Sequence, residues 1–229
     1  MDRVRSRLGA TANRLLDLAL PAACAGCGNE GAPLCPVCLP ALSARDDARP
    51  GLPIGMPSDV PTPLLQLEWC APFDGAVRRA LHDLKYAGEL RLVEPLGRAI
   101  ATRWQAAGAG GDCLVHVPVH VERARERGYD QADLLARVAA RALQLPHIPA
   151  LERARATTAQ FRLDRADRAT NVAGAFRIRP AVTSGAIAGR WVVLVDDVVT
   201  TGATLAACGL ALLEAGAVGV SALTIARER

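Results

Sequence analysis

The last third of the chain alternates apolar, strand-like runs with a helical pattern. Trp191 and the four aliphatic residues after it predict a strand over 191–196 that is buried on both faces. A helix is predicted over 203–215 and a second strand over 218–225. A strand, a helix and a strand in this order form a β-α-β unit, in which the two strands run parallel.

The middle of the chain continues the same pattern. A helical period extends over 73–104, and the glycine-rich run 108–111 ends it. The run 113–119 predicts a short strand, and a helix follows over 130–143 with Asp130 as its N-cap. We therefore predict an α/β fold with a central parallel sheet flanked by helices.

The N-terminal part of the chain differs in composition from the rest. Residues 1–20 predict an amphipathic helix, 21–40 form a cysteine-rich module, and 41–64 form a linker that is rich in Pro, Gly, Ala and Asp. The α/β domain then covers 65–229. Asp17 interrupts the apolar run before the cysteines, which argues against an export signal. No apolar stretch approaches the roughly 18 residues that cross a membrane, so we expect a cytoplasmic protein without a membrane span.

Arginine supplies almost all of the positive charge. The net charge is +4, and Lys85 is the sole lysine. Guanidinium groups suit phosphates because their planar forks donate two hydrogen bonds at once. Aromatic residues make up only 3% of the chain, which leaves few rings to stack on bases. This composition fits a phosphorylated small molecule better than a dedicated binder of single strands.

Four cysteines in the module have the spacing of a structural zinc site. Cys24 and Cys27 form one C-x-x-C pair, and Cys35 and Cys38 form a second one seven residues later. Two such knuckles can converge tetrahedrally on one Zn²⁺ ion, whereas redox chemistry at one pair is the competing interpretation. The remaining three cysteines stand alone in apolar surroundings and are expected to be buried: Cys70, Cys113 and Cys208.

Two adjacent acids lie at the end of the predicted strand 191–196 and precede a turn of threonines and glycine. Asp196 and Asp197 are expected at the carboxyl end of a parallel strand, where α/β sheets bind ligands. In the next turn, Gly202 allows a close approach to an anion, the hydroxyls can donate to phosphate oxygens, and the helix presents its free N–H groups. The alternative is that the acids cap the turn and the threonines cap the helix. Together the two features favour a ligand with a phosphate and a diol, such as a ribose 5-phosphate.

The chain resembles a known family at this motif and beyond it. The segment 192–204 resembles the phosphoribosyl diphosphate signature of type I phosphoribosyltransferases. With the cysteine module, the segments 81–89, 117–131 and 153–176 and the terminal pair 226–227 resemble the ComF family of bacterial competence-associated proteins over nearly the whole chain.

This resemblance implies a type I phosphoribosyltransferase-like fold and assigns roles to the two acids and the turn. Asp196 and Asp197 would be catalytic and face the ribose hydroxyls of phosphoribosyl diphosphate. The turn would bind the 5-phosphate through Thr200, Thr201, Gly202, Ala203 and Thr204.

Two further polar segments match the family. The segment 117–131 predicts a polar turn with three arginines, of which Arg123 and Arg127 would hold the diphosphate; a solvated basic turn is the alternative. The segment 153–176 lies where type I enzymes carry a loop that closes over the reacting centre, and a surface loop tied down by salt bridges is the alternative. Its matching residues are Gln160, Arg168 and Asn171. Lys85 receives no role, and His116 and His120 are interpreted as structural or peripheral.

Two functions are compatible with this pattern. In the first, the protein transfers the phosphoribosyl group from phosphoribosyl diphosphate to an acceptor that the sequence does not identify, with Mg²⁺ bound to the diphosphate. In the second, it binds this donor without turnover and acts through a protein or single-stranded DNA partner in competence. Fold alone does not decide between them.

Overall fold

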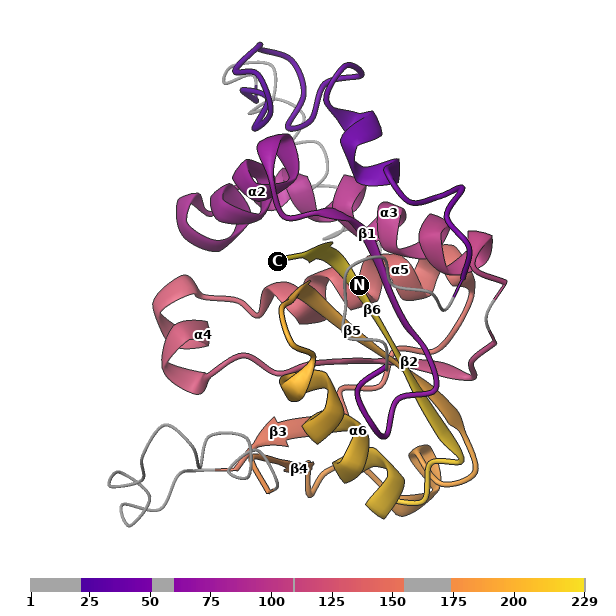
Figure 1. Cartoon of the computed structure of the whole chain (residues 1–229). Coiled ribbons are helices and arrows are strands. Elements are labelled where there is room, and N and C mark those ends of the chain that lie inside the picture. Colours follow the sequence, from indigo (N-terminus) through magenta and orange to yellow (C-terminus); the bar gives the residue numbers. More distant parts are fainter. Residues whose placement is uncertain (1–21, 51–59, 109, 155–173, 229) are drawn as a thin grey trace, which may run out of the picture.

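A four-stranded parallel sheet forms the centre of the protein (Figure 1). The computed structural model describes residues 22–50, 60–108, 110–154 and 174–228. Within them the strand order is β1-β6-β5-β2, and each neighbouring pair is parallel. This confirms the predicted α/β class with a central parallel sheet. The strands are β1 (Leu67–Pro72), β2 (Cys113–His116), β5 (Trp191–Val199) and β6 (Gly219–Arg227).

Helices cover both faces of this sheet, which is why β5 is a continuous aliphatic run. Val193 and Val195 pack in the hydrophobic cluster that contains the apolar faces of α3 and α5. Val192 and Leu194 point to the other face and pack in the cluster that contains α6. Among the described residues, no helix has the length and apolarity required to span a bilayer. The three helices are α3 (Val93–Ala106), α5 (Gln131–Leu143) and α6 (Ala203–Glu214).

The predicted continuous helix over 73–104 is wrong. Gly88 has a φ of 69°, in the left-handed region, and it ends the first helical segment. Lys85 therefore lies in a turn between two helices and not in the middle of one. The elements in this stretch are α2 (Gly75–His82), the π-helical turn η2 (Asp83–Ala87), the 3-10 turn η3 (Leu90–Leu92) and then α3.

The segment that was predicted as a basic turn is instead a short helix, α4 (Val121–Arg127). Gly128 ends it with a φ of 79°, and its N–H donates to the carbonyl of Ala124 at 2.9 Å. The predicted N-cap is confirmed, because Asp130 Oδ1 accepts from the N–H of Ala132 at 2.9 Å.

A two-stranded antiparallel ribbon stands apart from the central sheet. It pairs β3 (Leu151–Arg153) with β4 (Phe176–Ile178), the strands on either side of residues 155–173. Gln160, Arg168 and Asn171 lie outside the described residues, so their roles stay predictions. A short 3-10 turn, η7 (Ser184–Ala186), leads from the ribbon towards β5.

The cysteine module packs directly on the α/β body. Cys24, Leu34 and Leu42 belong to the same hydrophobic cluster as residues of α2 and α3. Arg79 of α2 donates from Nε to the carbonyl of Ala25 at 2.9 Å and also hydrogen bonds to that of Gly26. The predicted linker therefore begins with packed structure, the 3-10 turn η1 (Leu39–Ser43). The helix predicted over 1–20 lies outside the described residues, and the predicted domain limits stay predictions.

Candidate functional site at the end of β5

Strand β5 extends further than its neighbour β2, and this difference opens the site. The last residue of β2, His116, pairs with Val195, whereas β5 continues to pair with β6 on its other side up to Val199. Pro118 has no N–H to donate to the ladder, so the chain leaves the sheet there. Asp196 and Asp197 consequently lie beyond the end of β2 but within β5, which continues to Val199 and does not end at residue 196 as predicted.

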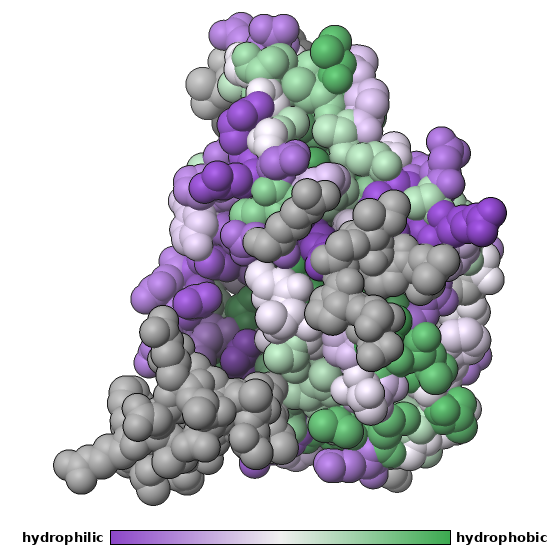
Figure 2. All heavy atoms as spheres, in the orientation of Figure 1, coloured by the Kyte–Doolittle hydropathy of each residue, from purple (hydrophilic) through white to green (hydrophobic). Residues whose placement is uncertain are grey.

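A cavity of about 710 Å³ lies at this end of β5. Figure 2 shows a hollow bordered by hydrophilic residues on the side of the molecule where α4 lies. The cavity brings together Asp196, Asp197, Arg123, Arg127 and Thr204, residues that the sequence analysis selected from separate segments. Its other described lining residues are Lys85, Tyr86, Val117, Pro118, Val119, His120, Glu122, Glu126, Gln131 and Arg153.

The two acids have different surroundings. Asp197 is 6% exposed, and its Oδ2 accepts from Gln131 Nε2 at 2.8 Å and pairs with Lys85 Nζ at 2.9 Å. Asp196 is partly exposed, and its Oδ1 accepts from the backbone N–H of Asp197 at 2.8 Å. Burial and the neighbouring charge of Asp197 raise the pKa of Asp196 well above its usual range. Asp197 is therefore held by donors, whereas the side chain of Asp196 has room to form a hydrogen bond with a ligand.

Lys85 is a site residue that the sequence analysis missed. The π-helical turn η2 carries it to within ion-pair distance of Asp197, and both side chains are largely buried, at 20% and 8% exposure. Such single π-helical turns are frequent at functional sites. Its isolation as the sole lysine, in a segment that matched the family, was the signal available.

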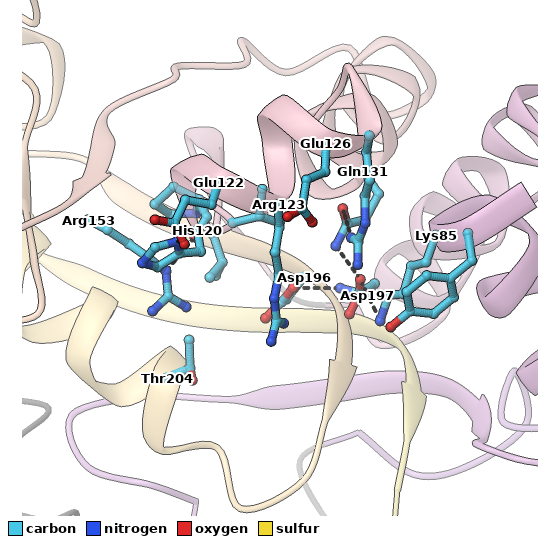
Figure 3. Close-up of a pocket in the computed structure, with 15 residues that line it drawn as sticks. Lys85, His120, Glu122, Arg123, Glu126, Gln131, Arg153, Asp196, Asp197 and Thr204 are labelled. Carbon is cyan, nitrogen blue, oxygen red and sulfur yellow. Dashed lines mark hydrogen bonds and ion pairs between the residues drawn. The ribbon is translucent and has the colours of Figure 1, made fainter. Parts of the chain in front are cut away.

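Several cationic groups point into the same cavity. Arg123 extends from α4 towards the end of β5, as Figure 3 shows. Arg127 donates to Gln131 Oε1 at 2.9 Å and lies over the ring of Tyr86, so a continuous set of contacts joins α4 to Asp197. Arg153, a second residue that was missed, donates from Nε to the carbonyl of Pro118 at 3.1 Å. This concentration of guanidinium groups suits a ligand with several negative charges.

The turn between β5 and α6 contributes less to the cavity than predicted. Thr204 lines it, but Thr200, Thr201, Gly202 and Ala203 are not among the described residues that do. The N–H of Ala203 donates to Thr201 Oγ1 at 3.4 Å, which is the capping role considered as an alternative. Gly202 has a φ of 80°, and a Cβ at this position would lie 2.6 Å from Cγ of Pro61, so the turn requires glycine for its own packing.

The four-cysteine cluster is a candidate metal centre. The sulfur atoms of Cys24, Cys27, Cys35 and Cys38 all lie within 4.8 Å of one another, and those of Cys27 and Cys35 are 3.7 Å apart. A tetrahedral Zn²⁺ ion with bonds of about 2.3 Å separates its sulfur ligands by about 3.8 Å. The cluster can therefore hold a structural zinc ion.

Backbone N–H groups prepare this cluster for a cation. Cys24 Sγ accepts from the N–H groups of Gly26 and Cys35, each at 3.3 Å. Burial alone would raise the pKa of the Cys24 thiol, but hydrogen bonds from the backbone of Cys35, Cys27 and Gly26 lower it to about 6. The thiolate of Cys24 is thus favoured, whereas burial and the neighbouring thiols raise the pKa of Cys38 to about 12.

Gly26 provides a test of this geometry. A Cβ at this position would lie 2.4 Å from Sγ of Cys38, so Gly26→Ala should displace that ligand. We expect zinc affinity to fall about 10- to 100-fold, measured by competition with a chromogenic chelator. Gly185→Ala is the matched control, because nothing lies within 4 Å of its added methyl group. Equal zinc affinity in both variants would contradict a closed four-sulfur site.

Comparison with known proteins identifies relatives over most of the chain, although no family model matches it. DNA utilization protein YhgH of Escherichia coli K12 is 33% identical over 201 residues, which cover 85% of this chain and 84% of that protein. The protein of the same name from Salmonella typhimurium is 32% identical over 211 residues, which cover 89% of this chain and 88% of that protein. Competence protein F of Haemophilus influenzae is 39% identical over 95 residues, 41% of either chain.

A solved structure of the glutamine phosphoribosylpyrophosphate amidotransferase from B. subtilis also matches, with a TM-score of 0.41 and 24% identity. The match covers 58% of this chain and 26% of that enzyme. The family assignment follows instead from the sequence identity and coverage of the YhgH proteins. On that basis, the chain belongs to the ComF family, with DNA utilization protein YhgH and Competence protein F.

Proposed function

We propose that the protein binds phosphoribosyl diphosphate with Mg²⁺ in the cavity at the end of β5 and transfers the phosphoribosyl group to an acceptor. The observation that carries this proposal is one cavity lined by two adjacent acids, by Arg123 and Arg127, and by Thr204 at the start of α6. A ligand that satisfies all three needs hydroxyl groups for the acids and phosphate groups for the cations. Phosphoribosyl diphosphate has both.

The acids would bind the ribose diol. Carboxylate oxygens accept hydrogen bonds from hydroxyl groups, and Oδ1 of Asp196 accepts from the backbone N–H of Asp197, which leaves Oδ2 for the sugar. Asp197 would keep its orientation through Lys85 and Gln131 while it shares an oxygen with the sugar. This arrangement would fix the ribose with its anomeric carbon towards the open part of the cavity.

The basic residues of the cavity would hold the diphosphate leaving group. Arg123, Arg127 and Arg153 can each donate two hydrogen bonds to phosphate oxygens. The carboxylates of Glu122 and Glu126 line the same cavity, and oxygen ligands of this kind fit Mg²⁺, which would neutralise charge on the diphosphate. As the bond from the anomeric carbon to the diphosphate breaks, these cations would stabilise the charge that develops on the leaving oxygen.

The names of the relatives suggest where such an activity would be used. Proteins called DNA utilization protein and Competence protein F are similar to this chain, so we place its cellular role in the handling of DNA. A cytoplasmic location remains a prediction.

A second candidate function is a donor-binding accessory protein without turnover. Two observations favour it: Asp197 is already paired with Lys85, and the turn 200–204 reaches the cavity only through Thr204.

Calorimetric titration of the full chain with phosphoribosyl diphosphate tests the proposal. With Mg²⁺ present we expect one site per chain and a dissociation constant between about 1 μM and 1 mM. Omitting Mg²⁺, or replacing the donor by ribose, should weaken binding. Diphosphate release would then be measured across nucleobase and amine acceptors. Release that depends on an acceptor establishes transfer, saturable binding without release favours the accessory protein, and absence of binding overturns both.

A further inference from the structure

A second polar cluster lies near the edge of the sheet, outside the cavity at the end of β5. It contains His116, the last residue of β2, Asp133 in the first turn of α5, and His147 in the segment after α5. Nδ1 of His116 lies 3.1 Å from Nε2 of His147. Both nitrogen atoms lie 3.6 Å from Oδ1 of Asp133.

The three atoms form a triangle of the size that a metal ion imposes. Bonds of about 2.0–2.1 Å in a tetrahedral site separate neighbouring ligand atoms by about 3.3–3.4 Å. The observed separations of 3.1 and 3.6 Å lie within a few tenths of an ångström of this value. The three ligand atoms are therefore close enough together to reach one ion, which would replace the hydrogen bond between the two imidazoles.

The carboxylate of Asp133 provides a second observation that supports a ligand at this cluster. Its Oδ1 is buried and accepts no hydrogen bond from the described part of the chain. A buried acceptor without a partner costs free energy. Its other oxygen, Oδ2, accepts from Nε of Arg137 at 2.8 Å, which fixes the carboxylate so that Oδ1 points at the two imidazoles.

Both histidines are available as ligands. Burial lowers the pKa of His116. Burial and the proximity of His116 lower the pKa of His147 to about 4. A neutral imidazole has a lone pair that can coordinate a metal, whereas an imidazolium has none.

We propose that His116, Asp133 and His147 bind a divalent transition-metal ion, for which Zn²⁺ is the best match to two nitrogen ligands and one oxygen ligand. The site is separate from the four cysteines and does not depend on phosphoribosyl diphosphate binding. His116 and Asp133 also line a second cavity of about 640 Å³, so an ion at this cluster would lie beside that space. Three protein ligands with one open position are typical of zinc sites that bind water or a substrate.

The second cavity indicates what the open position would take. Its walls include four arginines and three acids; Arg137 and Arg177 are paired with Asp133 and Glu152, which leaves Arg153 and Arg179 to attract an anion. An oxygen atom of a phosphate or carboxylate group could complete the coordination of the ion while its charge is balanced by these arginines. In the absence of such a ligand, water would occupy the position.

Nuclear magnetic resonance of the full chain, labelled with ¹⁵N at histidine, tests the site directly. The chain has four histidines, and two of them, His82 and His120, are exposed. During a Zn²⁺ titration we expect the ring nitrogen signals of His116 and His147 to shift together and to saturate at one ion beyond the one held by the cysteines. The signals of His82 and His120 should stay in place.

Two variants assign the response and separate it from misfolding. His147→Gln should abolish the shift at His116, whereas His82→Gln should leave it unchanged. Arg137→Ala removes the guanidinium that orients the carboxylate of Asp133, and we expect it to weaken Zn²⁺ binding about 10- to 100-fold. Asp133→Asn keeps both imidazoles and the side-chain size, and we expect it to weaken Zn²⁺ binding at least as much. The proposal is overturned if no histidine signal shifts in the wild-type protein, if the shifts belong to His82 or His120, or if Asp133→Asn binds as tightly as the wild type.

Discussion

Replacement of Asp197 by asparagine is expected to weaken the binding of phosphoribosyl diphosphate with Mg²⁺ by about 10- to 100-fold, since a hydrogen bond to a charged group contributes about 1.5–3 kcal/mol. The change removes an acceptor for the ribose hydroxyls and also the charge that orients Lys85. Asp196→Asn should have a loss of the same order, because that carboxylate faces the same cavity. Calorimetric titration of each variant measures the effect.

The control for these variants is an acid of the same type outside the cavity. Asp47 is exposed and does not line the cavity, so Asp47→Asn should bind with the affinity of the wild type. If Asp196→Asn and Asp197→Asn also retain that affinity, the ligand does not lie against these acids and the site is misplaced. Circular dichroism of each variant establishes that the fold is retained.

Arg103→Met is expected to lower the free energy of unfolding by about 3–5 kcal/mol, the usual cost of removing one partner of a buried ion pair. Arg103 is fully buried, and its Nε and Nη2 lie 3.1 and 2.5 Å from Oε2 of Glu68 in β1. The same guanidinium donates to the carbonyl of Ala48 at 3.1 Å, so it also holds the segment after η1 on the body. Urea denaturation followed by circular dichroism measures the change.

An exposed arginine on the same helix is the matched control. Arg98 donates to Glu94 at 2.8 Å, but both side chains are more than half exposed, so Arg98→Met should change the free energy of unfolding by no more than about 0.5 kcal/mol. The double variant Glu68→Leu, Arg103→Met should recover only part of the lost stability, because the buried guanidinium of Arg45 lies 3.9 Å from Oε2 of Glu68 and loses this partner. Equal effects of Arg98→Met and Arg103→Met would contradict a stabilising role for the buried pair.

The sequence predicted the sheet well because burial on two faces leaves a simple pattern. The aliphatic run before Asp196 and the helix after Gly202 were enough to predict a parallel β-α-β unit. They also placed the acids near the carboxyl end of a strand in that unit. The end of β5 was harder to place. Its acids continue to pair with β6, and nothing in the local sequence shows that the pairing on the other side stops at His116.

Helix α4 was missed for a physical reason. None of its residues is buried, so it has no apolar stripe from which a helical period can be recognised. The break at Gly88 was missed for the opposite reason, because the apolar residues before and after it keep a helical spacing across the turn. The position of Lys85 depends on that break. The contact of its ammonium group with Asp197 is a tertiary contact, which the sequence around either residue does not indicate.

The cluster of His116, Asp133 and His147 also depends on tertiary contacts that the local sequence does not indicate. Its members are far apart in the sequence and follow no metal-ligand spacing, whereas the four cysteines are close together and do. The cysteine cluster was therefore predicted from spacing alone, and the histidine cluster became visible only when α5 packed against β2.

Arg153 belongs to the walls of both large cavities, together with Pro118 and Val119. Its Nε is tied to the carbonyl of Pro118, so its position is fixed at the partition between the two spaces. One guanidinium cannot neutralise two anions in full, so a ligand that recruits it on one side makes it less available on the other. When the ligands proposed for the two cavities both bind, thermodynamic reciprocity requires each of them to alter the affinity of the other by the same factor.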